Sequence, residues 1–165
     1  MEILHSAIVE RENYQTEYEL ERGKPMPSLN HGIIQLNLGS LLKFKYKSEF
    51  TVATEVSLDL LGKPATPDIL VFDKRPFDWL HDKIKVTDPP LLTIEILSPK
   101  QAFDDLKDKI FDIYFPGGVK SAWIVLPTLK AISIFKTDGT TCLLSSGILK
   151  DPVLNIEIDL DDVFE

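Results

Sequence analysis

Two acidic residues lie inside apolar, strand-like segments of the sequence. Glu95 stands in the run 91–97 with an isoleucine on each side, and Asp68 opens another apolar run directly after a proline. A carboxylate at such a position is costly to bury unless it is paired or holds a metal. A β-hairpin between the two segments would bring the carboxylates together, and a divalent cation would relieve their repulsion. Mg²⁺ or Mn²⁺ bound there would lower the pKa of a bound water and stabilise charge on a phosphorus centre.

A purely structural role explains the same spacing. Asp68 could cap a turn and Glu95 could pair with a lysine, because isolated acids in strands often serve the fold alone. The residue types and their spacing therefore leave a metal site and a pair of structural contacts both open.

Composition limits the classes of protein to which the chain can belong. Its 165 residues, of which 44 % are apolar and 27 % charged, fit a single globular domain spanning residues 1–165. The net charge of −8 argues against unspecific coating of nucleic acid, which needs a basic face, but is compatible with an acidic metal site. One cysteine excludes a disulfide framework, and no apolar run approaches the roughly 20 residues of a membrane span. We therefore expect a cytoplasmic protein with no membrane partner.

The pattern of apolar residues predicts two helices and a β-rich block. Residues 18–24 are predicted as a short strand running into a glycine turn. Ser28 or Asn30 can cap a helix that begins near His31, with apolar residues at helical spacing and lysines at its end. A second helix, 103–113, ends before a Pro-Gly-Gly turn. Strands are predicted at 50–58, 67–73, 91–97 and 122–126, and a hairpin joins 130–136 to 140–144 through Asp138-Gly139.

This order of elements implies a mixed β-sheet with helices packed on it. The polar segment 74–90 is expected to be a loop or a short irregular helix, and the tail 156–165 an edge element. Trp79 and Phe77 in the loop could stack on a base, or could close the loop over the core or over a second subunit.

Several short motifs, taken in order, resemble one group of nucleases. Pro67-Asp68 is followed 27 positions later by Glu95, the first residue of Glu-Ile-Leu-Ser-Pro. This pair resembles the metal-binding motif of the PD-(D/E)XK nuclease superfamily, and more closely that of the bacterial putative restriction endonuclease domain family of undetermined function. The likeness covers nearly the whole chain and includes Tyr18-Glu19-Leu20, Gly23, Pro27-Ser28, His31, Asp105, Lys109, Tyr114, Gly118-Val119 and Trp123-Ile124-Val125.

The resemblance implies an α/β fold in which a restriction-endonuclease-like mixed β-sheet is flanked by helices and followed by an additional C-terminal β-hairpin. It implies a divalent-metal-dependent nuclease with Asp68 and Glu95 as ligands of Mg²⁺ or Mn²⁺. Lys109 would assist the attacking water, while Glu19 and His31 would complete the catalytic pocket. Nucleic acid, with DNA favoured, would be the partner, and a homodimer is implied because such folds commonly cut duplexes with two sites.

The sequence departs from the superfamily at one position that concerns the chemistry. Leu97 stands where the third motif has a lysine, and the family resemblance instead supplies that lysine from the following helix, at Lys109. Helical geometry alone does not show whether Lys107 or Lys109 faces the site, because the two lysines lie about 80° from the apolar stripe, on opposite edges of it. Lys109 could also pair with Asp105 on a solvated face.

His31 is the third candidate that the residues themselves suggest. It lies in the first turn of the predicted helix, with Gln35 one turn later on the same face. There it could contact a phosphate or a metal-bound water, or it could serve only at the surface or as a cap.

Two functions follow from these residues, a metal-dependent nuclease and a catalytically inactive nuclease-fold protein that binds nucleic acid or another protein. The leucine at position 97 and the net charge of −8 favour the second. A structural protein whose acids form surface pairs is a third interpretation. An enzyme should lose cleavage when Asp68, Glu95 or Lys109 is replaced, whereas a binding module should keep its affinity for the partner.

Overall fold

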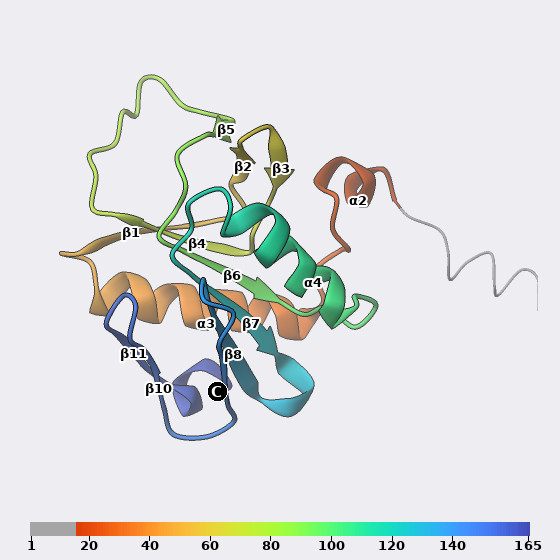
Figure 1. Cartoon of the computed structure of the whole chain (residues 1–165), viewed down its shortest axis with the longest axis vertical. Coiled ribbons are helices and arrows are strands. Elements are labelled where there is room, and N and C mark those ends of the chain that lie inside the picture. Colours follow the sequence, from red (N-terminus) through yellow and green to blue (C-terminus); the bar gives the residue numbers. More distant parts are fainter. Residues whose placement is uncertain (1–15) are drawn as a thin grey trace, which may run out of the picture.

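The computed structural model describes residues 16–165, and a six-stranded mixed β-sheet forms its centre (Figure 1). The strand order is β1-β4-β6-β7-β8-β9, in which β6 and β7 are parallel and every other neighbouring pair is antiparallel. The strands are β1 (Phe50–Thr54), β4 (Ile69–Asp73), β6 (Leu92–Ile96), β7 (Ser121–Leu126), β8 (Ala131–Lys136) and β9 (Thr141–Leu144).

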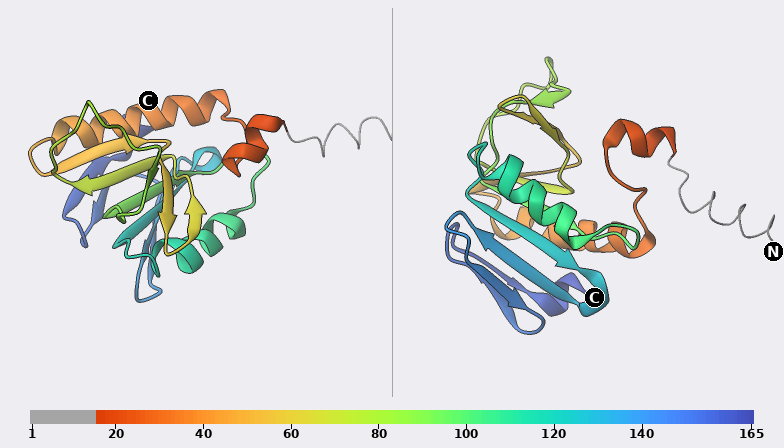
Figure 2. Two further views of the ribbon diagram at one scale, coloured as in Figure 1. Left: turned by 90° about the horizontal axis from the view of Figure 1, so that it is seen from above. Right: turned by 45° about the vertical axis from the view of Figure 1, so that its right-hand side comes forward.

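Helices and two small sheets cover both faces of the central sheet (Figure 2). One face is covered by the long helix α3 (Leu29–Lys45), the hairpin of β10 (Ile148–Asp151) and β11 (Ile156–Asp159), and the short helix α5 (Leu160–Val163). The other face is covered by α4 (Phe103–Lys109), the π-helical turn η1 (Ile110–Tyr114) and a three-stranded sheet. That sheet has the order β3 (Lys63–Ala65), β2 (Ser57–Leu60), β5 (Lys85–Val86). The helix α2 (Glu17–Arg22) precedes α3, and the 3₁₀ turn η2 (Pro127–Leu129) follows β7.

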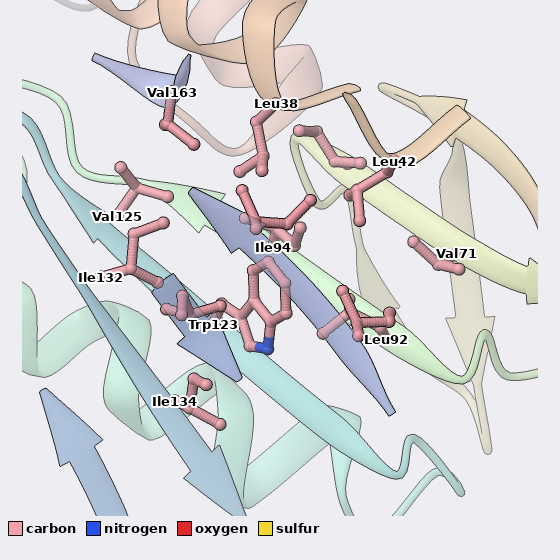
Figure 3. Packing of buried hydrophobic residues seen from close by; sticks show 14 of the residues in the cluster. Leu38, Leu42, Val71, Leu92, Ile94, Trp123, Val125, Ile132, Ile134 and Val163 are labelled. Atoms are coloured by element: carbon pink, nitrogen blue, oxygen red, sulfur yellow. The ribbon is translucent and has the colours of Figure 1, made fainter. Parts of the chain in front are cut away.

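Because both faces are covered, each of the two central strands has apolar side chains on both sides. Every residue of β6 is buried, and so are the first five residues of β7. On the α3 side Trp123 packs in a cluster with Leu38 and Ile94 (Figure 3). On the opposite side Leu106 of α4 and Ile124 of β7 belong to a second cluster. Glu95 thus lies in a strand with no solvated face.

A buried carboxylate joins the β10–β11 hairpin to the central sheet. Asp151, 1 % exposed, accepts hydrogen bonds from Ser121 Oγ at 2.5 Å and Trp123 Nε1 at 2.8 Å. Both donors belong to β7 and are themselves buried, so Asp151 satisfies polar atoms that would otherwise lack partners. This acid therefore serves the fold.

Most predicted elements are found where the sequence placed them. Ser28 caps α3, whose first residue is Leu29, and the strands β4, β6 and β7 and the helix α4 agree with their predicted ranges to within a few residues. The Asp138-Gly139 turn joins β8 to β9 as expected. The mixed α/β architecture with an additional hairpin is therefore confirmed.

The prediction of a strand at 18–24 is wrong, because these residues form most of α2. Thr16 caps the helix with its side chain, and the Glu19 carboxylate accepts the Thr16 backbone N–H in return. Gly23 ends the helix in the left-handed conformation with φ of 65°. The Thr-x-x-Glu spacing that specifies this capping box is present in the sequence.

Three further local predictions need correction. The strand predicted at 50–58 is divided, because Glu55 adopts a φ of 60° and the chain turns from β1 into β2. The loop 74–90 contains the two-residue strand β5, which pairs with β2. The tail is not an edge of the central sheet, since β11 pairs only with β10 and α5 packs beside α3. Among the helices of residues 16–165, none has the length and apolarity to cross a bilayer.

Candidate functional site

Asp68 and Glu95 lie side by side on neighbouring strands. Asp68 directly precedes β4, and its backbone N–H donates to the Ile94 carbonyl of β6 at 3.1 Å. Its carboxylate Oδ2 accepts the Ile96 backbone N–H at 2.6 Å, so Asp68 binds the chain on both sides of Glu95. Both acids are 1 % exposed. The antiparallel pairing of β4 with β6 produces the juxtaposition expected from the sequence.

Two side chains from the N-terminal part of the chain contact the Asp68 carboxylate. His31 Nε2 lies 3.1 Å from Oδ1, and the Lys24 ammonium contacts the same oxygen. Lys24 is itself buried and donates to the Thr66 carbonyl at 3.1 Å. Burial raises the pKa of Asp68, but the hydrogen bond from His31 and the charge of Lys24 outweigh it, so this pKa is lowered overall. Asp68 is therefore ionised and has its charge balanced by the protein.

Glu95 has a separate pair of partners, both from the segment that follows β6. Lys109 Nζ lies 3.1 Å from Glu95 Oε1, and the Tyr114 hydroxyl donates to the same oxygen. Burial and the negative charge of Glu95 raise the pKa of Tyr114 well above its usual value, so its hydroxyl stays protonated. Lys107 instead pairs with Asp104 at 2.8 Å on the solvent side of α4. The structure thus places Lys109, and not Lys107, in the site.

The π-helical turn η1 explains how two residues five positions apart reach one oxygen. In a regular α-helix, Lys109 and Tyr114 would point about 140° apart. The wider turn, in which the Phe115 N–H donates to the Ile110 carbonyl, carries both side chains to Glu95. Single π turns often occur at functional sites.

A polar layer connects α2 and α3 to Asp68. Gln35 Nε2 donates to the Asp68 carbonyl at 3.0 Å and to Glu55 Oε1 at 3.1 Å. Glu55 also contacts Arg22 and, at 3.4 Å, Lys24 Nζ. The sequence did not reveal Lys24 and Glu55, because both lie in irregular segments between elements, nor Arg22, because it ends a helix that was predicted as a strand.

Glu19 lies at the start of α2, and its carboxylate contacts backbone groups. One oxygen accepts the Thr16 N–H at 3.1 Å and the other the Met26 N–H at 3.0 Å. These bonds lower the pKa of Glu19 and fix the segment that carries Lys24. Within residues 16–165 the structure therefore brings together Asp68 with His31, and Glu95 with Lys109, while the Glu19 carboxylate is occupied by the backbone.

The donor atoms suit a magnesium-type ion better than zinc. In residues 16–165 no group of three or more His, Cys, Asp and Glu side chains is arranged to hold a metal. Mg²⁺, however, commonly binds one or two protein carboxylates and completes its octahedron with water and phosphate oxygens. Glu95 Oε2 forms no hydrogen bond within these residues, whereas the Lys24 ammonium already neutralises Asp68. Two adjacent carboxylates fit such an ion. Its binding would require Lys24 either to move away from Asp68 Oδ1 or to share that oxygen with the metal.

The buried ion pairs of Asp68 predict a pH-dependent loss of stability on replacement. The Asp68→Asn variant should be less stable near neutral pH by about 2 to 4 kcal/mol, because Lys24 then loses its nearest counter-ion and keeps only the more distant Glu55. Since the folded-state pKa of Asp68 is lowered, the wild-type advantage is present above the unfolded-state value near 3.8 and disappears as the pH falls through the folded-state value. Urea unfolding of both proteins at neutral and acidic pH measures the difference. A difference that persists unchanged in acid would contradict this account.

Known proteins resemble this chain in sequence and in fold. A model of the family Uma2, described as "Putative restriction endonuclease", matches residues 6–160. A putative nuclease belonging to DUF820 from Anabaena variabilis ATCC 29413 superposes with a TM-score of 0.73 and 21 % identity, over 85 % of this chain and 83 % of that chain. At that identity the likeness shows the fold, which is the restriction-endonuclease-like fold expected from the sequence. No curated protein matches the chain.

Proposed function

Because this chain belongs to the Uma2 family of putative restriction endonucleases, we propose that it is a divalent-metal-dependent nuclease that hydrolyses phosphodiester bonds in nucleic acid, with DNA favoured. The observation that supports this best is the pair of buried carboxylates, one just before β4 and one in β6, with Lys109 in contact with the second. Mg²⁺ or Mn²⁺ bound by Asp68 and Glu95 would supply an activated water and charge stabilisation at the phosphorus.

The remaining residues of the site orient groups and balance charge. The Lys109 ammonium, 3.1 Å from Glu95, is placed to hold the attacking water or a phosphate oxygen. His31 holds Asp68 Oδ1 at 3.1 Å and so fixes the direction of the carboxylate. Glu19 has a positioning role in this proposal, because its backbone contacts hold the α2 segment that delivers Lys24 to the site.

The proposal is tested by removing and restoring the metal. The purified protein is incubated with single-stranded and duplex DNA and RNA after treatment with a chelator, and then with added Mg²⁺ or Mn²⁺. We expect cleavage only with metal, and a calorimetric titration with Mn²⁺ should show a site in the wild type that is absent from Asp68→Asn. Cleavage that continues without metal, or an Asp68→Asn variant that binds Mn²⁺ as the wild type does, would overturn the proposal.

An inactive nuclease-fold protein that binds nucleic acid or another protein is the second candidate. Leu97 at the position of the motif lysine favours it, as does the Lys24 ammonium, which already balances the charge of Asp68. In that case the chain should bind its partner without metal, and neither Mg²⁺ nor Mn²⁺ should produce cleavage of any of the four nucleic acids.

A further inference from the structure

A cleft with a basic lining lies beside the two carboxylates. It has a volume of about 380 Å³ and is lined by α2, the three-stranded sheet β3-β2-β5 and α4. Three of its lining residues are cations from three different elements, namely Arg22, Lys85 and Lys109. One acid, Glu21, also lines the cleft, so its lining side chains carry a formal charge of +2 in a chain whose net charge is −8. The cleft is therefore suited to an anionic ligand.

The cleft leads directly to the proposed site. Lys109 lines it and also contacts Glu95 Oε1 at 3.1 Å. Arg22, another lining residue, contacts Glu55, which neighbours Lys24 in the polar layer. A ligand in the cleft would thus contact Lys109, the partner of Glu95, and Lys85 of β5.

The loop that leads into β5 projects away from the sheet (Figure 1), and its aromatic residues are exposed. Trp79 is 89 % exposed and Phe77 57 %, and their ring centroids are 5.5 Å apart. The loop therefore does not close over the core of its own chain. Lys83 and Lys85 follow the aromatic pair, are exposed, and form no ion pair within residues 16–165.

We propose that a single strand of nucleic acid runs from the carboxylates through this cleft to the loop. Arg22 and Lys85 would contact its phosphates, and a base beyond the cleft would stack on Trp79. The cleft is in the size range of small-ligand pockets, which admits one nucleotide but not a duplex. Exposed aromatic rings beside unpaired lysines are the combination that binds single strands without base-pair recognition. This inference rests on the proposed function, because it names the substrate strand of that same site.

The loop offers a direct signal for the test. The chain has two tryptophans, and Trp123 is 0 % exposed, so quenching of tryptophan fluorescence by a bound base reports on Trp79. A thymidine oligonucleotide is titrated into the protein in chelator, so that binding is measured without cleavage. We expect quenching by the single strand, with little by the matching duplex. Trp79→Leu should abolish the quenching and raise the Kd about fivefold or more, as measured by anisotropy of a labelled strand.

The salt dependence of binding measures the contribution of Lys85 separately from that of Trp79. Lys85→Ala should weaken binding and reduce the slope of log K against log salt by about one phosphate contact. Lys120→Ala is the matched control, because Lys120 is an exposed lysine just before β7, outside the residues that line the cleft, and should leave both quantities unchanged.

Three outcomes would overturn this path. The first is binding without quenching, and the second is equal affinity for the duplex. The third is a Trp79→Leu variant that changes the sedimentation mass but not the affinity, since the loop would then be an interface between two copies of the chain. Metal-dependent cleavage without quenching would reject the path of the strand to Trp79 and leave the proposed nuclease activity intact. Quenching without cleavage would support that path and reject the nuclease activity.

Discussion

Replacement of Glu95 by glutamine should lower metal-dependent cleavage by about a thousandfold or more, because a metal-supported charge stabilisation of several kcal/mol is lost. Glutamine keeps the shape of the side chain and a carbonyl oxygen for Lys109 and Tyr114, but it removes the negative charge. The rate constant of cleavage under single-turnover conditions measures the effect, with Mg²⁺ and Mn²⁺ each at saturation.

Two controls distinguish loss of chemistry from loss of fold. Glu49→Gln removes an acid of the same type at an exposed position just before β1, and its cleavage rate should stay within about twofold of the wild type. Urea unfolding of Glu95→Gln should show a folded protein whose stability is changed much less than its rate. A Glu95→Gln variant with near-wild-type cleavage would show that the carboxylate is a structural partner of Lys109.

The adjacency of the two acids could be predicted because it follows from strand pairing. The apolar runs around Asp68 and Glu95 predict buried strands, and consecutive strands in a mixed sheet are often neighbours. Ser28 and the apolar spacing after it likewise define α3, which delivers His31 to Asp68. Local signals therefore sufficed for Asp68, Glu95 and His31.

The rest of the site depends on irregular backbone, for which periodicity carries no signal. Lys24 reaches Asp68 from the segment after α2, and Glu55 enters the polar layer from a residue with positive φ. The π turn that brings Tyr114 to Glu95 also breaks the helical spacing from which side-chain directions were estimated. Only the capping box of Thr16 and Glu19 could have been recognised and was missed.

Alanine at Lys109 should lower cleavage by about a hundredfold or more, whereas alanine at Lys107 should change it by less than about twofold. The two lysines are two positions apart in the sequence but have different contacts. Lys109 contacts Glu95 and its side chain is 19 % exposed, while Lys107 pairs with Asp104 and its side chain is 41 % exposed. An exposed ion pair such as Lys107–Asp104 contributes little to stability. Lys107→Ala is therefore a matched control, because it removes the same charge from the same helix.

The same pair of variants also separates two roles that Lys109 could have, in charge balance alone or in the chemistry as well. If Lys109 only balances the charge of Glu95, then Lys109→Ala should reduce the stability of the fold and leave Mn²⁺ binding unchanged or stronger, because a competing cation has been removed. If Lys109 also holds the water or the phosphate, the cleavage rate at saturating metal should fall even where Mn²⁺ binds fully. Equal cleavage by Lys107→Ala and Lys109→Ala would remove Lys109 from the proposed chemistry, because its contact with Glu95 is the observation that places it there.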